Sequence, residues 1–154
     1  MAGVTGLAIW TIGYEGATQA AVIEALRTAG VELLADVRYL PLSRRPGFSK
    51  SGLASALTEA GIAYRHFKQL GTPPEGRAAA RSGDHAGMAR SYAGQLELPE
   101  AIAQMAELRA LASAKRTALL CFEREPAHCH RSLLHAALFE DFRRIDLTPP
   151  LPGP

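Results

Sequence analysis

The sequence predicts an α/β fold: a single three-layer domain with a mainly parallel central sheet flanked by helices. Short apolar runs alternate along the chain with longer segments of helical periodicity, which is typical of strand–helix–strand units with parallel strands. One run, residues 117–122, is almost continuously apolar, as expected for a central strand covered on both faces. The 154 residues, 47% hydrophobic and 21% charged, suit one domain with a real core.

The first half of the chain contains three predicted strands. Residues 7–12 and 32–37 are apolar runs, and the segment between them, 18–29, carries apolar residues at helical spacing and stops at Gly30. We expect the strands on either side of this helix to form a parallel pair. A loop over 40–52 leads into a short helix over 53–60, and residues 62–66 alternate like a third strand.

The second half begins with a Gly/Pro/Arg/Ala segment, residues 71–87, that shows no clear periodicity. We predict a long loop there, of the kind that serves as a lid or binding loop or is locally disordered. Helices follow over 99–112 and 130–142, with the apolar strand between them and a short final strand over 145–147. The domain is therefore expected to span residues 1–147, followed by a Pro-rich flexible tail over 148–154.

Charge and cysteine content limit the function. The net charge of +2 is too small to indicate nucleic acid by itself, but Arg38, Arg44, Arg45 and Lys50 lie close together and could bind an anion. Two cysteines are too few for a disulfide scaffold. With no secretory signal and no apolar run of membrane-spanning length, we expect reduced thiols, a cytoplasmic location and no membrane partner.

Polar residues follow the end of each predicted strand. In open parallel sheets, ligands bind outside the carboxyl ends of the strands, so we expect these groups to converge on one edge. Gly13 and Tyr14 offer a turn at the start of a helix, and Arg38 offers a planar fork suited to phosphate or carboxylate, oriented by Asp36. A tight strand-to-helix turn and a purely structural Asp–Arg pair are the alternative interpretations.

The segment 119–131 is the most informative part of the chain. A buried strand containing Cys121 runs through Glu123 into a short loop that ends in Cys129-His130-Arg131 at the predicted start of a helix. A thiol at a helix N-terminus beside Arg and His is placed where a thiolate is favoured, so Cys129 is the better candidate for reactivity. The common phosphatase pattern, Cys followed six residues later by Arg, is absent at both cysteines.

The same segment carries metal-ligating residue types: Cys121, Glu123, His128, Cys129 and His130. Seven residues between the cysteines match no standard paired ligand arrangement, and adjacent residues on a helix point in different directions. We therefore assign no metal ligand from the sequence and keep a Cys/Glu/Cys/His metal site as a third hypothesis.

In order along the chain, the motifs resemble those of a family of uncharacterised bacterial and archaeal proteins, domain of unknown function 488. The matching pieces are TIGY at 11–14, DVR at 36–38, PLSR at 41–44, Phe48, Leu53, GIAYRH at 61–66, LG at 70–71, CFE at 121–123 and CHR at 129–131. The resemblance implies a compact α/β domain with these motifs on one edge, but no established reaction. Glu15 departs from the family, where Ser is common, and the end of the chain after Phe142 is short.

Our leading hypothesis is a pocket for a phosphorylated or nucleotide-like small molecule, with a reactive cysteine. The expected site residues are Cys129, Glu123, His130 and Asp36 for catalysis, and Gly13, Tyr14, Arg38, Arg44 and Arg131 for anion binding. The second hypothesis is a non-enzymatic module for nucleic acid or a protein partner, in which Arg77 and Arg81 extend a basic surface. The sequence leaves open whether the protein is an enzyme, its cofactors and its oligomeric state.

Overall fold

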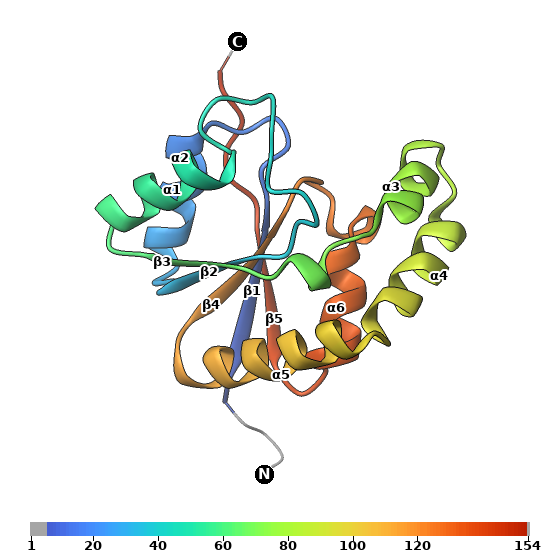
Figure 1. Ribbon diagram of the computed structural model, residues 1–154. Helices are drawn as coiled ribbons and strands as arrows, with labels where there is room; N and C mark the ends of the chain where they lie inside the picture. Colours follow the sequence, from blue (N-terminus) through green and yellow to red (C-terminus); the bar gives the residue numbers. More distant parts are fainter. Residues whose placement is uncertain (1–5, 154) are drawn as a thin grey trace.

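The computed structural model describes residues 6–153; the start of the predicted domain, residues 1–5, and the last residue of the predicted tail lie outside the described part. A single five-stranded sheet runs through the centre of the molecule, with every strand pairing parallel to its neighbours (Figure 1). The strand order is β3-β2-β4-β1-β5. The strands are β1 (Ala8–Gly13), β2 (Leu33–Asp36), β3 (Ala63–His66), β4 (Thr117–Cys121) and β5 (Arg143–Leu147).

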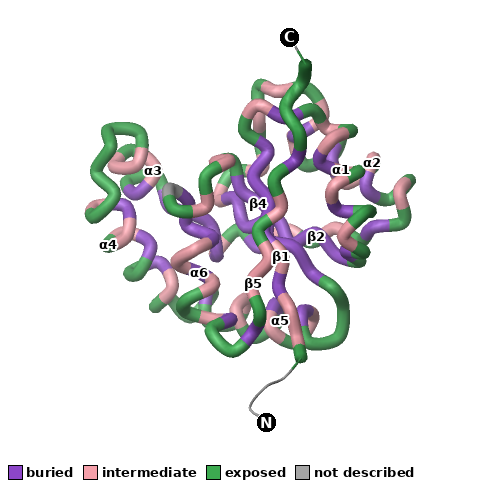
Figure 2. Tube along the Cα trace, turned by 180° about the vertical axis from the view of Figure 1, so that it is seen from behind, coloured by how far each residue is buried: buried purple, intermediate pink, exposed green. Residues whose placement is uncertain are grey.

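Helices cover both faces of the sheet, which confirms the predicted three-layer α/β fold. On one face, α1 (Gln19–Thr28) and α2 (Lys50–Glu59) pack in one apolar cluster with Leu34 and Leu120. On the other face, α4 (His85–Leu96), α5 (Pro99–Ala114) and α6 (His130–Leu138) pack in a second cluster with Ile9 and Leu119. Figure 2 shows the resulting buried core along β1, β2 and β4.

The predicted pairing of the first two strands is wrong. β1 and β2 are parallel, but β4 lies between them and pairs with both. All five residues of β4 are buried, as its continuous apolar sequence indicates. The crossover through α1 therefore skips one place in the sheet, and the most apolar strand fills the centre.

The predicted long loop over 71–87 is also wrong, because most of it is helical. α3 (Pro74–Arg81) has Pro74 in its first turn, and the Asp84 side chain caps α4 by accepting from the Gly87 N–H at 2.8 Å. A Cβ on Gly76 would lie 2.8 Å from Ser91 Oγ, so glycine lets α3 pack closely on α4. The exposed turn between them, residues 82–84, joins two helices that stand out from the sheet (Figure 1).

The C-terminal part closes the sheet. α6 ends at Leu138 rather than at 142, and β5 begins at Arg143 and pairs along β1 as an edge strand. Residues 148–153 have no regular structure, although the Pro149 carbonyl accepts from Arg124 Nη1 at 2.7 Å. Among the described helices, none combines the length and apolarity that crossing a membrane requires.

Candidate functional site

The carboxyl ends of the strands meet at one edge of the sheet, because all five strands run parallel. This brings together Gly13 of β1, Asp36 of β2, His66 of β3 and Cys121 of β4. The predicted convergence is confirmed, and it is where ligands bind in open α/β sheets.

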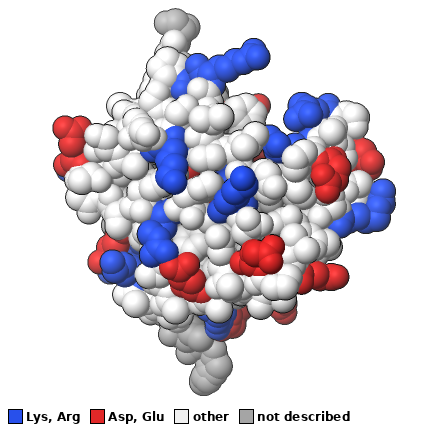
Figure 3. Space-filling model, viewed as in Figure 1, with Lys and Arg blue, Asp and Glu red and all other residues white. Residues whose placement is uncertain are grey.

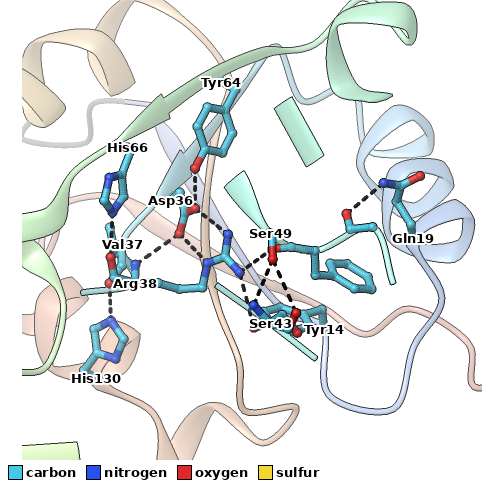
Figure 4. A network of polar contacts seen from close by, with 12 residues as sticks. Tyr14, Gln19, Asp36, Val37, Arg38, Ser43, Ser49, Tyr64, His66 and His130 are labelled. Carbon is cyan, nitrogen blue, oxygen red and sulfur yellow. Dashed lines mark hydrogen bonds and ion pairs between the residues drawn. The ribbon is translucent and has the colours of Figure 1, made fainter. Parts of the chain in front are cut away.

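Asp36 and Arg38 form the most highly bonded pair at this edge, and both are buried (Figure 4). The two Asp36 oxygens accept from Arg38 Nε at 2.8 Å and from Nη2 at 2.7 Å, and the Tyr64 hydroxyl also donates to this carboxylate. Arg38 Nη1 donates to the Phe48 carbonyl at 2.6 Å and to the Tyr14 hydroxyl at 3.3 Å. Four of its five guanidinium N–H groups therefore donate to protein acceptors, although Arg38 lines the pocket described below.

Two histidines hold the backbone that follows β2. Nε2 of His66 lies 2.8 Å from the Arg38 carbonyl oxygen, and Nε2 of His130 lies 2.7 Å from that of Val37. Figure 4 shows both rings directed at this segment from different elements. Burial lowers the pKa of His130 to about 4, so its ring is neutral at neutral pH.

Gly13 and Tyr14 have a structural role in this turn. The Tyr14 and Glu15 N–H groups donate to the carbonyls of Cys121 and Phe122, at 3.3 and 2.8 Å, which extends the β1–β4 pairing past the strand ends. A Cβ on Gly13 would lie 1.8 Å from the Glu123 carbonyl oxygen, so only glycine fits. These bonds engage the Tyr14 and Glu15 N–H groups within the protein, as the alternative interpretation of a tight strand-to-helix turn expects.

A pocket of about 740 Å³ opens beside these residues. Its walls come from the loop after β2, from α3 and the start of α4, and from the loop between β4 and α6. Its basic lining residues are Arg38, Arg44, Arg45, Arg77 and Arg81, and its acidic ones are Glu15, Glu123 and Glu125. Figure 3 shows basic and acidic side chains interspersed over the visible face rather than one continuous basic patch.

The arginines of the pocket differ in how far they are engaged. Arg45 donates twice to the Ala17 carbonyl, so it fastens the loop to the turn before α1. Arg44 and Arg81 are exposed, and Arg77 is half-buried beneath the ring of Tyr39. Arg77 Nε is buried without a hydrogen-bond partner among the described residues. Arg44, Arg77 and Arg81 are therefore the cations best able to meet a ligand.

The expectation of reduced thiols is wrong for this structure, in which Cys121 and Cys129 form a disulfide. The loop after β4 turns back through a short helix, η2 (Pro126–His128), and returns the chain to the strand end. Cys129 does cap α6, as predicted: its Sγ accepts from the Arg131 N–H at 3.4 Å. Both cysteines are buried, and neither lines the pocket.

Glu123 and His130 lie against the two cysteines and also line the pocket. The ligand atoms of Cys121, Glu123, Cys129 and His130 all lie within 4.8 Å of one another. This contradicts the expectation that the adjacent Cys129 and His130 diverge. Cys129 has extended backbone angles, φ −124° and ψ 147°, so the two side chains do not follow helical spacing. The side chain of His128 lies outside the described part of the structure.

Arg131 is fully buried and does not line the pocket. Its Nη2 donates to the carbonyls of Glu123 and Arg124, both at 3.0 Å, while Nε and Nη1 have no partner among the described residues. Burial lowers its pKa to about 10. The geometry makes Arg131 a clamp on the loop that carries Glu123, rather than an accessible anion ligand.

His85 and Met88 also line the pocket, although we did not predict them as site residues from the sequence. They belong to the start of α4, within or next to the segment that we predicted as a loop. The usable signals were Pro74, which suits the first turn of a helix, and Asp84, which suits a helix cap.

Comparison with known proteins gives one finding. The family model described as Domain of unknown function DUF488 matches residues 18–138, which confirms the resemblance drawn from the motifs. Searches of curated proteins and of solved structures found no match.

Proposed function

The chain belongs to the family of domain of unknown function DUF488, and we propose that it binds a phosphorylated, nucleotide-like small molecule in the pocket at the carboxyl edge of its sheet. One observation carries the proposal: arginines from two separate elements, Arg44 and the pair Arg77 and Arg81, line one cavity. A guanidinium presents a fork of donors that matches phosphate oxygens.

The charge and size of the pocket support an anionic small molecule. Arg38 is paired with Asp36, but the other four arginines still outnumber the three glutamates, so the lining is net basic. A volume of about 740 Å³ lies within the range of small-molecule sites, roughly 300–1,000 Å³. The half-open pocket and the mixed charges of the visible face favour this ligand over a nucleic-acid duplex, which needs an extended basic surface.

The apolar part of the lining favours a ligand with a planar or apolar portion as well as a phosphate. Leu42 is 70% exposed, Leu40 44% and Phe122 43%, and all three line the pocket. Large apolar side chains left in water beside a basic pocket suit a nucleobase, which stacks on aromatic and apolar surfaces.

The binding test compares inorganic phosphate, adenosine and adenosine 5′-monophosphate by isothermal titration calorimetry. We expect the monophosphate to bind more tightly than either fragment. Arg77→Met should weaken its binding by roughly tenfold or more, because a hydrogen bond to a charged group contributes about 1.5–3 kcal/mol. Arg90→Met is the matched control, because Arg90 is exposed on α4 and does not line the pocket.

Two results would count against the proposal. One is the absence of monophosphate binding at millimolar concentration. The other is an equal loss of affinity in Arg77→Met and Arg90→Met, which would place the ligand outside the pocket.

The reactive-cysteine part of the hypothesis applies to the reduced protein. Its support is the position of Cys129 at the N-terminus of α6, where Sγ accepts an N–H and lies 3.9 Å from His130 Nδ1. Alkylation of reduced protein with iodoacetamide tests it. If the alkylation rate rises with pH as that of an ordinary free thiol does, Cys129 does not have the proposed role. Fast alkylation at a pH below the ordinary thiol pKa supports the role.

A further inference from the structure

Four side chains bring metal-ligating atoms within 4.8 Å of one another at the edge of the pocket: Cys121, Glu123, Cys129 and His130. Three of them are buried, and Glu123 is half-buried. We propose that the reduced protein binds one zinc-type divalent ion there through the two Sγ atoms, His130 Nδ1 and the Glu123 carboxylate. Two thiolates, an imidazole and a carboxylate form a four-ligand set of the kind that zinc takes.

The hydrogen bond of His130 prepares its ring as a ligand. Nε2 lies 2.7 Å from the Val37 carbonyl oxygen, which can only accept, so Nε2 carries the proton. Nδ1 then holds a lone pair and lies 3.9 Å from Cys129 Sγ. A metal-ligating histidine is typically fixed in this way, with its other nitrogen donating to a carbonyl or a carboxylate.

The backbone around Cys129 favours a thiolate. The Arg131 N–H donates to its Sγ, and this sulfur caps the nine-residue helix α6. Both features stabilise negative charge on the sulfur. Arg131 Nη2 donates to the carbonyls of Glu123 and Arg124. These bonds fix the segment that carries the fourth ligand, the Glu123 carboxylate.

A disulfide alone does not account for this arrangement. The Cys121–Cys129 bond needs no imidazole lone pair beside it. A sulfur at 3.9 Å is a weak partner for buried Nδ1, whereas a metal ion between these atoms would use the lone pair fully.

The disulfide and the metal site exclude each other, so the site requires reduction. A water-soluble phosphine cleaves the S–S bond, and with one water molecule it yields the phosphine oxide and two thiols. A divalent ion then displaces one proton from each thiol and forms two metal–sulfur bonds. Zinc does not change its oxidation state in this exchange.

The experiment uses the full chain reduced with a phosphine, freed of metal by chelator and then titrated with Co²⁺, which reports sulfur ligation by a near-ultraviolet charge-transfer band. We expect one equivalent of Co²⁺, displaced by zinc, and no band in the oxidised protein. Cys129→Ser leaves Cys121 as the one sulfur ligand, so it should lower the intensity of the band per bound Co²⁺ to about half and weaken binding, and Glu123→Gln should weaken Co²⁺ binding by about tenfold or more. Glu125→Gln is the matched control on the same loop and should bind as the unaltered chain does.

The proposal is overturned if the reduced, folded chain shows no sulfur-to-cobalt band, or if Cys129→Ser keeps the full intensity of the band and the same Co²⁺ affinity. Equal Co²⁺ affinities for Glu123→Gln and Glu125→Gln would overturn the four-ligand set. Circular dichroism checks that each variant folds. Comparison of oxidised with reduced protein needs no substitution, so it tests the site even if a cysteine variant does not fold.

Discussion

Asp36 and Arg38 lie only two positions apart, yet both oxygens of the carboxylate bind the guanidinium, at 2.8 and 2.7 Å, and both residues are buried. The same guanidinium reaches the Phe48 carbonyl and the Tyr14 hydroxyl. One side chain therefore ties the end of β2 to the loop that forms a pocket wall and to the turn after β1. The pair stabilises the frame of the pocket, and most of the Arg38 N–H donors bind protein acceptors rather than a ligand.

Arg38→Met is expected to lower the free energy of unfolding by about 3–5 kcal/mol, because it leaves the Asp36 carboxylate buried without its cation. Urea denaturation measures the change. Glu107→Gln is the matched control, since it removes an exposed ion pair with Arg65 and should cost less than about 1 kcal/mol. Similar losses in both variants would show that the buried pair is replaceable.

Gly13→Ala is expected to destabilise the fold by about 2 kcal/mol or more, because its methyl group would overlap the Glu123 carbonyl and force the β1 and β4 ends apart. Thermal unfolding compares it with Gly94→Ala. A Cβ on Gly94 meets no atom within 4 Å, and alanine favours the helix by roughly 0.5–1 kcal/mol. The two substitutions should therefore act in opposite directions. A Gly13→Ala protein as stable as the unaltered chain would contradict this account.

Local patterns predict the elements of this fold but not their neighbours. The apolar runs identify the strands because burial requires apolar residues wherever a strand lies. The position of β4 between β1 and β2 depends on contacts between residues about 80 to 110 positions apart, such as Trp10 with Ala118. The α3–α4 hairpin was missed because α3 packs through small residues such as Gly76 and contains no large apolar side chain.

The candidate site could likewise be predicted only in part from the sequence. Its edge follows from parallel strands, so Asp36, His66 and Cys121 could be placed together from the sequence alone. The convergence of Cys129 with His130 could not, because it depends on the extended backbone of a capping residue rather than on helical spacing. The engagement of Arg38 and Arg131 by protein acceptors also depends on distant carbonyls, and residue type alone does not reveal those partners.

Asp146 is expected to stabilise the protein at neutral pH and to lose this effect in acid. Burial acts to raise its pKa, but hydrogen bonds from Thr11 and Arg144 outweigh it and hold the pKa below its usual value. Since the folded pKa lies below the unfolded one, the stabilisation is present above the unfolded pKa, about 3.9, and is lost as the pH falls through the folded value.

Asp146→Asn should therefore lower the free energy of unfolding at pH 7 by less than about 1 kcal/mol, because the site is partly exposed. The difference from the unaltered chain should shrink below about pH 4. Urea denaturation at several pH values between about 3 and 7 measures this difference. The range brackets the reference pKa of aspartate. Glu59→Gln, at an exposed position on α2, should change stability little at either limit of this pH range. A pH-independent difference for Asp146→Asn would show that the carboxylate charge is not responsible.

Reduction of the Cys121–Cys129 disulfide is expected to lower stability, and zinc to restore it. The bond joins residues separated by eight positions, and closing a loop of that size destabilises the unfolded chain by about 2.5 kcal/mol. Reduced protein in chelator should therefore unfold at lower urea concentration than oxidised protein. An ion that binds only the folded state at a hundredfold its Kd adds about 2.7 kcal/mol, so zinc should return the midpoint to near that of the oxidised form. Cys129→Ala should abolish both effects. A reduced protein that zinc does not stabilise would leave the disulfide as the only link between these two cysteines.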